Sequence, residues 1–369
     1  MDYAQEHVTT LHDLTDPTPD APLADSAVVI PIAGDSVEAV TPEYIFAPLE
    51  RAGPGEVVVP LRAPAEVVAG FREWVAQFDL SVTTVWCDAP ALSGLLEEHD
   101  LGGPTGKGRD VWLGLGIAAD RADFVAVHDA DATTYAASTV PRLLAPLAMD
   151  HEFVKGYYAR VEGGKLYGRL VRLFIAPLVR ALEERHAHPF VRYLDAFRYP
   201  LAGEFAFTAD AARRIRSQRA WGLEIGMLGE TYDIAGPERS AQVDLGLHQH
   251  DHKPVGGRGG LSSMSEQVGA ALLRAVEEAG VDPEYETLTE RYRAAGERLV
   301  DQYAADAAFN GLTYDAEAEY EQVEAYAAGI QRPGPDTRLP AWEDVDLSPA
   351  AVVETARAAR MEAVDGDAD

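Results

Sequence analysis

The sequence predicts an α/β fold built on a doubly wound, mostly parallel sheet, followed by a helical extension at its C-terminal end. Short β-branched apolar runs alternate with stretches of helical periodicity over the first 160 residues. The connections between them are short, which is typical of parallel strands joined by crossover helices. Since ligands bind such sheets beyond the carboxyl ends of the strands, we expect the loops after Ala33, Cys87 and Val127 to form the mouth of one crevice.

The expected elements follow one another in order along the chain. Strands are expected at 27–33, 56–61, 80–87, 123–131 and 153–161, and helices between them at 41–53, 64–78, 107–120 and 137–149. The alternation is less regular from about 160 to 255, where we expect a helix at 168–185, an apolar turn region at 200–208 and a strand at 241–248. Amphipathic helices are expected at 263–280, 285–309 and 318–330.

These patterns divide the chain into three parts. Residues 1–25 are polar and punctuated by proline, and we expect an arm or a short helix ahead of the fold. Residues 26–255 form the expected ligand-binding domain, and 256–369 form a helical extension that clamps the core or provides a dimer interface. The closing DGDAD is expected to be frayed.

The charge of the chain excludes some partners. It has 61 acidic and 31 basic residues, so its formal net charge of -30 would repel nucleic acid and anionic membrane surfaces. The only lysines are Lys107, Lys155, Lys165 and Lys253. Diffuse acidity with so little lysine suggests a protein that works in concentrated salt, where charge repulsion is screened, and an ordinary acidic protein is the alternative.

Hydropathy and cysteine content suggest a cytoplasmic protein. No window approaches the roughly 18 consecutive apolar residues of a membrane-spanning helix, and the N-terminal residues lack the basic-then-apolar pattern of a signal peptide. We therefore expect no integral membrane segment. Cys87 is the only cysteine, and its place in an apolar run predicts a buried small residue without a chemical role.

The sharpest local signal is HDAD at the end of the strand FVAVHDAD. It places Asp129 and Asp131 where the chain leaves the sheet. Two carboxylates at this spacing suit a hard divalent cation that bridges a diphosphate. A bare DxD pair is equally typical of a solvated turn, and its position at the end of a parallel strand favours the functional interpretation.

A glycine-rich loop, GGPTGKGRDVW, precedes this strand by about twenty residues. Its glycines permit close backbone approach, and Lys107 provides a point charge at the start of a helix. It is not a P-loop, because Gly108 stands where a serine or threonine would be needed. Lys107 is therefore a candidate contact for a donor phosphate, and a structural turn is the alternative.

The segment HQHDHK follows the strand AQVDLGL and places His248, His250, His252 and Lys253 close together. One of these imidazoles could complete a metal site begun by Asp131. Zinc is the obvious rival, but no second Cys or His pair has zinc spacing. An oxygen-rich Mg²⁺ or Mn²⁺ site with one imidazole fits better. The remaining histidines considered for this role are isolated in the sequence: His128, His186 and His188.

Basic residues cluster in KLYGRLVR, where Lys165, Arg169 and Arg172 are expected near the start of a helix. Guanidinium groups at a helix N-terminus form a receptor for phosphate or carboxylate, although a solvated helix face is the alternative for any one of them. Glu204 and Glu224 lie in apolar, glycine-containing segments. Because a buried carboxylate is costly unless it is hydrogen-bonded or orients a ligand, both are candidate catalytic residues.

Seven of these segments, taken in order, resemble the motif series of the glucosyl-3-phosphoglycerate synthases. They are VVIPIAGD, GKGRDVW, FVAVHDAD, GRLVRLFIAPLV, PLAGEFAFT, WGLEIGMLGETYD and QVDLGLHQHDHKP, and the similarity covers roughly residues 26–280. Members of that family have a GT-A fold, form dimers and use Mg²⁺ or Mn²⁺. They transfer glucose from a nucleoside-diphosphate glucose to 3-phosphoglycerate with retention of configuration. The resemblance implies the same for this chain, with 26–255 as its catalytic domain.

The resemblance also implies roles for individual residues. Asp131 and His250 would hold the metal. Gly168 and Arg169 match the acceptor-binding turn, beside Lys165, and Glu204 and Glu224 match acids around the sugar and the acceptor. On the donor side, the residues that the resemblance and the loop positions select are Pro31, Ile32, Asp35, Lys107, Asp129 and Lys253.

Two departures leave specificity open. The family commonly has Asn-Glu where this chain has Gly34-Asp35, and a threonine of the acceptor turn is replaced by Val171. Mannosyl-3-phosphoglycerate synthases share the GKG, DAD and AGE pattern, and another phosphorylated or lipid-phosphate acceptor stays possible. A sugar-phosphate nucleotidyltransferase would need a GxGxR loop after the first strand, which IAGDSV lacks. A non-catalytic nucleotide-sugar binding protein is the remaining alternative.

Overall fold

The computed structural model describes residues 4–249 and 257–365. Within these residues a nine-stranded sheet forms the centre of the molecule, in the order β1-β11-β7-β10-β6-β2-β4, and both β3 and β5 pair with β4. The strands are β1 (Thr9–Leu11), β2 (Ser26–Val29), β3 (Ile32–Ala33), β4 (Glu56–Arg62), β5 (Val82–Trp86), β6 (Phe124–Val127), β7 (Phe153–Ala159), β10 (Phe205–Thr208) and β11 (Ser240–Leu247).

The sheet is mostly parallel, as the sequence predicts. Only β10 runs antiparallel, between β6 and β7, and Phe205 pairs with Val127 on one side and with Lys155 on the other. β10 thus reverses the chain direction in the middle of the sheet. A separate hairpin, formed by β8 (Val161–Glu162) and β9 (Lys165–Leu166), follows β7.

Helices connect the strands and continue to the C-terminal end. Those of the first half are α1 (Val37–Val40), α2 (Glu43–Ala52), α3 (Ala65–Val75), α4 (Pro90–Glu98), α5 (Lys107–Arg121) and α6 (Thr139–Leu144), which continues into a 3₁₀ turn (Ala145–Met149). Those that follow are a π-helical turn (Val171–Ile175), α7 (Ala176–Glu183), α8 (Pro189–Ala196), α9 (Ala209–Arg214), α10 (Leu223–Ile234), α11 (Gly257–Glu278), α12 (Tyr285–Phe309), α13 (Ala316–Ala327), a 3₁₀ turn (Trp342–Asp344) and α14 (Pro349–Asp365).

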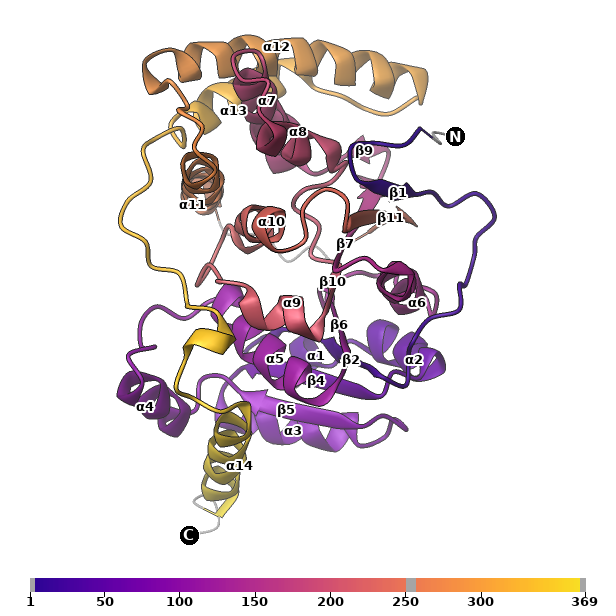
Figure 1. Ribbon diagram of the computed structural model, residues 1–369. Coiled ribbons are helices and arrows are strands. Elements are labelled where there is room, and N and C mark those ends of the chain that lie inside the picture. Colours follow the sequence, from indigo (N-terminus) through magenta and orange to yellow (C-terminus); the bar gives the residue numbers. More distant parts are fainter. Residues whose placement is uncertain (1–3, 250–256, 366–369) are drawn as a thin grey trace.

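The helices cover both faces of the sheet. Figure 1 shows α5, α9 and α10 on one side of the central strands, and α2 and α6 on the other. The alternating apolar runs of the sequence therefore produce the predicted doubly wound architecture. No helix within the described parts of the chain is long and apolar enough to cross a membrane.

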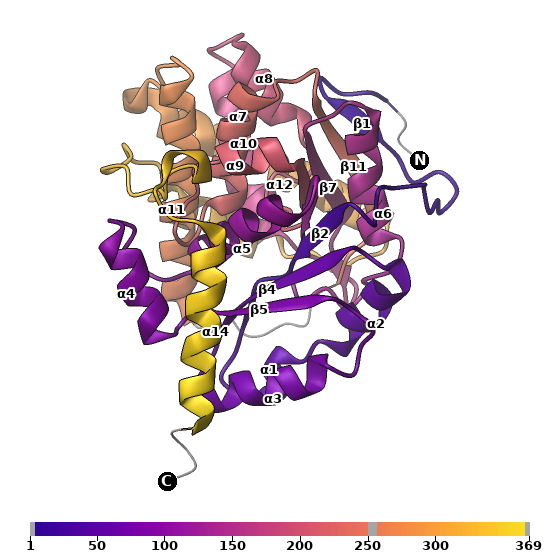
Figure 2. The ribbon, with the colours of Figure 1, turned by 60° about the horizontal axis from the view of Figure 1, so that its bottom comes forward.

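The C-terminal extension separates into two parts. Helices α12 and α13 pack on α7 and the π-helical turn, whereas α14 packs on α3, α4, α5 and β5 at the opposite end of the molecule. Figures 1 and 2 both show α14 beside α4, and Figure 1 shows α12 at the opposite end of the molecule. The connecting segment is fixed where the indole rings of Trp112 and Trp342 stack with centroids 4.1 Å apart. Trp342 Nε1 donates to the Trp112 carbonyl at 2.7 Å.

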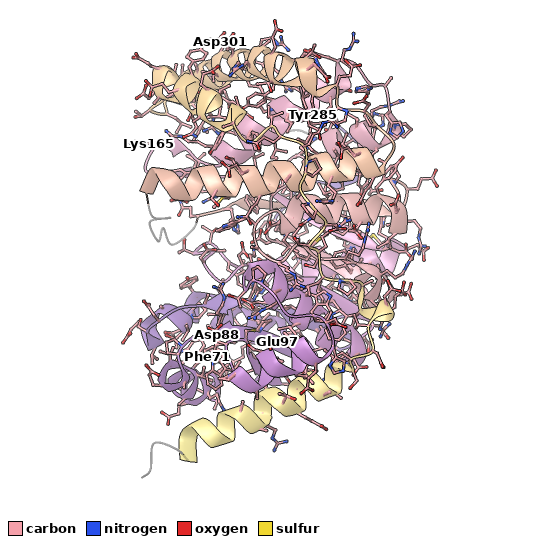
Figure 3. The ribbon with its side chains drawn as sticks, turned by 90° about the vertical axis from the view of Figure 1, so that its left-hand side faces the viewer. Phe71, Asp88, Glu97, Lys165, Tyr285 and Asp301 are labelled. Atoms are coloured by element: carbon pink, nitrogen blue, oxygen red, sulfur yellow. The ribbon has the colours of Figure 1, made fainter. Side chains whose placement is uncertain are left out.

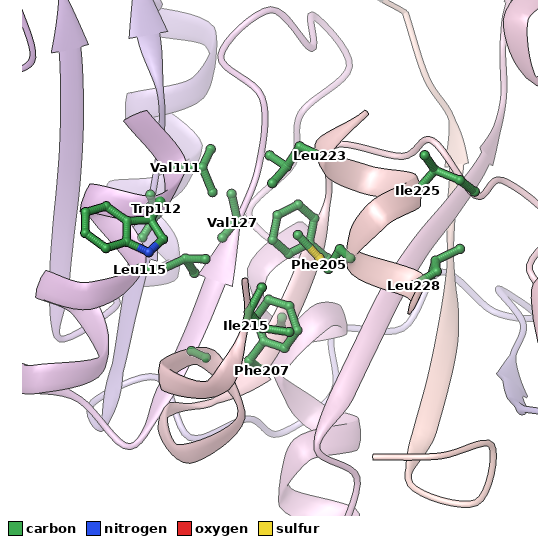
Figure 4. Packing of buried hydrophobic residues seen from close by; sticks show 14 of the residues in the cluster. Val111, Trp112, Leu115, Val127, Phe205, Phe207, Ile215, Leu223, Ile225 and Leu228 are labelled. Carbon is green, nitrogen blue, oxygen red and sulfur yellow. The ribbon is translucent and has the colours of Figure 1, made fainter. Parts of the chain in front are cut away.

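The core that positions the site lies between α5, β6, β10 and α10. Figure 4 shows Val127 and Phe205 between Val111 of α5 and Leu223 of α10. All four side chains are at most 1% exposed. Because each helix starts beside this apolar cluster, its burial brings the first turn of α5 and the first turn of α10 together.

Two expectations about local structure need correction. Residues 9–11 are not ahead of the fold, because they pair in parallel with Ala241–Val243 and add a strand to the edge of the sheet. Lys165 does not start a helix, because Gly163 and Gly164, both with positive φ, turn the chain into the β8–β9 hairpin. The helical segment begins only at Arg169.

Candidate active site

A cavity of about 550 Å³ opens beyond the carboxyl ends of β2, β4 and β6. The sequence predicts a crevice at this edge of the sheet, formed by the loops after Ala33, Cys87 and Val127. Among the described residues, the loop after Cys87 contributes none to the wall of the cavity. The residues that line it are Pro31, Ile32, Ala33, Glu38, Ala39, Thr41, Pro42, Tyr44, Arg62, Lys107, Asp110, Asp129, Ala130, Asp131, Arg160, Trp221 and Met264. Pro31, Ile32, Lys107, Asp129 and Asp131, all predicted from the sequence, therefore meet at one site.

Lys107 is the central cation of this cavity. Its Nζ lies 2.6 Å from Oδ1 of Asp129 and 2.7 Å from Oε1 of Glu224. The three residues come from the start of α5, the loop after β6 and the start of α10. One ammonium between two carboxylates leaves this group with a net negative charge, so it is suited to bind a cation.

The pKa shifts of the three groups follow from their mutual contacts. Burial alone would lower the pKa of Lys107, but Asp129 and Glu224 outweigh it and raise that pKa above its ordinary value. Burial raises the pKa of Asp129 to about 6, against the opposing charge of Lys107. For Glu224 burial is outweighed by Lys107 and Lys155, so its pKa is lowered. Lys107 and Glu224 are therefore charged at neutral pH.

The glycines of the Gly-Lys-Gly segment allow a protein segment to approach closely. A Cβ on Gly108 would lie 1.8 Å from the carbonyl oxygen of Gln218, so only glycine fits there. The Arg109 backbone N–H donates to the Arg219 carbonyl at 2.9 Å in the same contact. The segment that leads into α10 is thus held against the start of α5, which fixes the distance between Lys107 and Glu224.

The HDAD loop is tied to the segment that carries the histidine cluster. The Thr133 backbone N–H donates to the Gln249 carbonyl at 2.8 Å, and the Gln249 N–H donates to the Thr134 hydroxyl oxygen at 3.1 Å. Tyr44 fixes the loop from the other side, because its hydroxyl donates to the Ala130 carbonyl at 3.1 Å. His250 follows Gln249 directly in the sequence, but both His250 and Lys253 lie outside the described residues.

His128, which stands apart from the other histidines in the sequence, is packed against Tyr135 in the fold. It is fully buried, and its Nε2 lies 3.0 Å from the Tyr135 hydroxyl. Burial lowers its pKa to about 4, and Glu204 and His248 are near enough to influence it. Its Nδ1 lies 3.1 Å from the Asp129 carbonyl oxygen, so a neutral imidazole contacts the backbone of the HDAD loop.

Glu204 is buried beneath the site rather than exposed to the cavity. It is 1% exposed, and its Oε1 lies 3.5 Å from His248 Nε2. The His248 ring stacks on Tyr158 with centroids 4.0 Å apart, and Tyr158 in turn contacts Tyr199. Glu204 thus belongs to a layer of aromatic and imidazole rings that supports the wall of the cavity.

Lys155 is a second buried lysine near these acids, and the sequence analysis assigned it no role. Its Nζ donates to the Ala202 carbonyl at 2.7 Å and lies 5.2 Å from the centre of the Phe205 ring. Burial lowers its pKa to about 8, against the opposing influence of Glu224 and Glu204. Phe153 to Tyr158 of β7 are all buried, so no alternation of buried and exposed residues distinguished this lysine in the sequence.

The predicted acceptor residues are not among those that line the cavity, although Gly168 lies next to Tyr199. A Cβ on Gly168, whose φ is +75°, would meet the Tyr199 hydroxyl at 2.7 Å. The Tyr199 side chain lies near enough to Arg160 for the two to interact electrostatically, and Arg160 lines the cavity. Arg169 follows in the first helical turn, whereas Lys165 is exposed in β9 (Figure 3).

Other residues of the site were not predicted. Arg62 and Arg160 line the cavity at the end of β4 and just after β7, and position at the end of an apolar strand was the signal that could have found them. Arg62 Nε is 2.9 Å from Oδ2 of the buried Asp110. Asp35, by contrast, is exposed and is not among the residues that line the cavity.

The described residues contain no cluster of three histidine, cysteine or carboxylate side chains able to hold a metal ion. The site nevertheless offers hard oxygen ligands, because the carboxylates of Asp129 and Asp131 both line the cavity. Such ligands suit Mg²⁺ or Mn²⁺.

Comparisons with known proteins agree with this architecture. No protein-family model matches the chain. The chain is 34% identical over 364 residues to a glucosyl-3-phosphoglycerate synthase of Methanococcoides burtonii. The aligned region covers 92% of this chain and 90% of that protein. It is 36% identical over 287 residues to the synthase of Persephonella marina, covering 73% and 71%.

Solved structures lead to the same group. The glucosyl-3-phosphoglycerate synthase of Mycobacterium tuberculosis in complex with Mg²⁺ and uridine diphosphate matches with a TM-score of 0.55 and 25% identity, over 75% of this chain and 88% of that one. The sequence relationship spans nearly the whole length of both proteins in the Methanococcoides comparison, and the fold and motifs coincide. The chain belongs to the glucosyl-3-phosphoglycerate synthase family.

Proposed function

We propose that the chain is a metal-dependent glycosyltransferase that moves glucose from a nucleoside-diphosphate glucose to 3-phosphoglycerate with retention of configuration. The observation that carries this proposal is the meeting of Lys107, Asp129 and Glu224 at a cavity of the sheet, in a chain of this family. Of the Mycobacterium tuberculosis protein, one structure contains Mn²⁺, uridine-diphosphate-glucose and phosphoglyceric acid.

The nucleotide diphosphate is proposed to bind between the ends of β2 and β6. Pro31 and Ile32 line the nucleotide side of the cavity, and Lys107 and Lys253 contact the diphosphate. Lys107 is positioned for this by its ion pairs with Asp129 and Glu224, because they hold the ammonium in one place before the donor arrives. Asp35 is proposed to contact the nucleotide from the rim.

The metal is proposed to be held by Asp131 and His250. The tie between Thr133 and Gln249 supports this pair, since it holds the chain next to His250 against the loop that carries Asp131. Asp129 adds a second carboxylate beside them. A bound Mg²⁺ or Mn²⁺ would neutralise the charge that develops on the leaving diphosphate.

The transfer itself breaks the bond between the anomeric carbon and the diphosphate oxygen and forms one to the acceptor hydroxyl oxygen. The hydroxyl is proposed to attack from the side of the leaving group and to pass its proton to the diphosphate, which retains the configuration. No protein nucleophile is needed. Glu224, which Lys107 keeps ionised, can accept hydrogen bonds from sugar or acceptor hydroxyls, and Glu204 supports the same wall from beneath.

The acceptor is proposed to lie against Gly168 and Arg169, with Lys165 at the outer edge. Arg169 can bind a phosphate or carboxylate through two parallel hydrogen bonds. Tyr199 joins this turn to Arg160 at the cavity wall, so an acceptor there lies next to the donor. One structure of the Mycobacterium tuberculosis protein holds glycerol 3-phosphate, so glycerol phosphates belong in the acceptor test.

Release of nucleoside diphosphate, with the product identified by mass spectrometry, tests the proposal. The donors are UDP-, GDP- and ADP-glucose and GDP-mannose, and the acceptors are 3-phosphoglycerate, glycerol 3-phosphate and a lipid phosphate. Transfer of mannose alone would support the mannosyl alternative, and transfer only to another acceptor would replace 3-phosphoglycerate. Donor binding without transfer in any combination would leave a nucleotide-sugar binding protein.

The domain division and a homodimer are also proposed, with 26–255 as the catalytic domain and 256–369 as its helical extension. The side chain of Phe309, at the end of α12, is 89% exposed and is therefore accessible to a second copy of the chain. Light scattering of the purified chain and of Phe309→Asp tests this assignment.

A further inference from the structure

A buried carboxylate from the C-terminal extension meets the arginines of the acceptor turn. Glu319 of α13 accepts from Arg169 Nε at 3.2 Å and from Arg172 Nη1 and Nη2 at 2.8 and 3.1 Å. The Glu319 side chain is only 5% exposed. A segment about 150 residues further along the chain therefore reaches the acceptor turn, since Glu319 and Arg169 are 150 positions apart.

Arg172 holds this carboxylate in one place. Its two terminal nitrogens bind both Glu319 oxygens, its Nε donates to the Tyr167 carbonyl at 3.0 Å, and its guanidinium lies 4.8 Å from the centre of the Tyr303 ring of α12. Each of the three guanidinium nitrogens of Arg172 thus donates a hydrogen bond. Glu319 is fixed by Arg172, and Arg172 is fixed by the turn itself.

Arg169 differs from Arg172 in what it leaves accessible. Its side chain is 48% exposed, compared with 8% for Arg172. Glu319 contacts Arg169 only through Nε, on one edge of the planar guanidinium. Two guanidinium groups and one carboxylate carry a net charge of +1, and the accessible part of that charge is on Arg169.

We propose that Glu319 is a positioning residue for the acceptor. By accepting a hydrogen bond from Nε of Arg169, it turns the two terminal nitrogens of that guanidinium toward the acceptor's phosphate or carboxylate. Arg172 serves as the anchor of this contact and does not touch the acceptor. The inference rests on the proposed function, in which Arg169 binds the acceptor. It makes acceptor affinity depend on the C-terminal extension, through α13.

A second ion pair on the same helix provides a matched control. Glu324 of α13 binds Arg293 Nε at 2.9 Å, but its side chain is 57% exposed and its partner lies on α12, not on the acceptor turn. An exposed pair of this kind contributes little to stability. Glu324→Gln removes the same charge from the same helix without touching Arg169.

The experiment measures KM for 3-phosphoglycerate, KM for the nucleotide sugar and kcat in wild type, Glu319→Gln and Glu324→Gln, with thermal unfolding of each. Glu319→Gln should raise the acceptor KM about tenfold, because an amide oxygen cannot bind two guanidinium groups as a carboxylate does. The donor KM and kcat should change less than about twofold. Glu324→Gln should match the wild type in all three constants.

A second variant covers the case in which Glu319→Gln fails to fold because a buried guanidinium is left without its partner. Glu319→Gln/Arg172→Met removes both buried charges and should show the same rise in acceptor KM. An unchanged acceptor KM in either folded variant, or an equal change of donor and acceptor KM, overturns the inference alone. If the wild type forms no glucosyl-3-phosphoglycerate, the proposed function fails first, and this inference fails with it.

Discussion

The ammonium of Lys107 lies 2.6 Å from Oδ1 of Asp129, and this contact links the glycine-rich loop to the HDAD motif. Glu224 accepts from the same ammonium at 2.7 Å. In the proposed donor complex the phosphates compete with these carboxylates for one cation, so the cluster would hold Lys107 in place when the cavity is empty and release it toward the diphosphate when the donor binds.

Replacing Lys107 should weaken donor binding before acceptor binding. Lys107→Ala removes a charged hydrogen bond of about 1.5–3 kcal/mol, which corresponds to a rise of about tenfold or more in donor KM. Initial rates with varied nucleotide sugar measure it. Lys165→Ala, which removes the same charge from the exposed β9, should leave the donor KM unchanged. Equal effects of the two substitutions would show that the charge acts over a distance and not through a contact.

Arg169→Lys should affect the acceptor alone. A lysine keeps the charge but cannot form two parallel hydrogen bonds, so the acceptor KM should rise about tenfold with little change in donor KM. Arg293→Lys is the matched control, because Arg293 also pairs with a glutamate of α13 but lies on α12. If Arg169→Lys changed neither constant, Arg169 would be part of a solvated helix face.

Removal of divalent metal should abolish transfer. We expect no product in excess chelator and recovery on addition of Mg²⁺ or Mn²⁺, because the diphosphate would otherwise leave without a neutralising charge. Asp131→Asn should shift the metal concentration that restores half of the activity to a higher value. Full turnover in chelator would contradict the proposed metal site.

His128 makes stability depend on pH. Burial lowers its pKa to about 4 in the folded protein, whereas an imidazole in an unfolded chain titrates near about 6.5. Between these values the unfolded state binds more protons, so the free energy of unfolding decreases as pH falls from about 6.5 toward 4.

The variant His128→Asn isolates this contribution, because asparagine does not titrate. Over the same pH range the free energy of unfolding of the variant should decrease less than that of the wild type. The difference between the two decreases should be up to about 3 kcal/mol. Urea unfolding at several pH values between about 4.5 and 6.5 measures both proteins. Parallel pH profiles would show that the His128 imidazole is not kept neutral by its surroundings.

Salt should stabilise the folded chain. With a net charge of -30, repulsion among surface carboxylates is strong at low ionic strength and is screened within about 3 Å at 1 M salt. The thermal midpoint should therefore rise steeply between low and molar KCl. A flat dependence would mean that the acidic composition is not an adaptation to salt.

Local patterns in the sequence were sufficient for the alternation of strands and helices and for several residues of the cavity. Apolar runs of period 2 and 3.6 report burial along one element, so β4, α5 and α12 lie within one or two residues of their predicted bounds. A parallel sheet brings the ends of its strands to one edge, which is why Ile32, Asp129 and Lys107 could be expected at one crevice.

Contacts between distant elements were decided only by the tertiary structure. Lys107 and Glu224 are 117 positions apart, and Arg172 and Glu319 are 147 positions apart. No repeating pattern of residue types in the sequence indicates either pair, because each depends on how two helices pack on a shared core. The sequence by itself determined the class of fold, the family and several of the residues that line the cavity, since these follow from short segments. The tertiary structure decided which charges neutralise one another and that a C-terminal helix contacts Arg169 and Arg172, because ion pairs form wherever packing brings buried charges together.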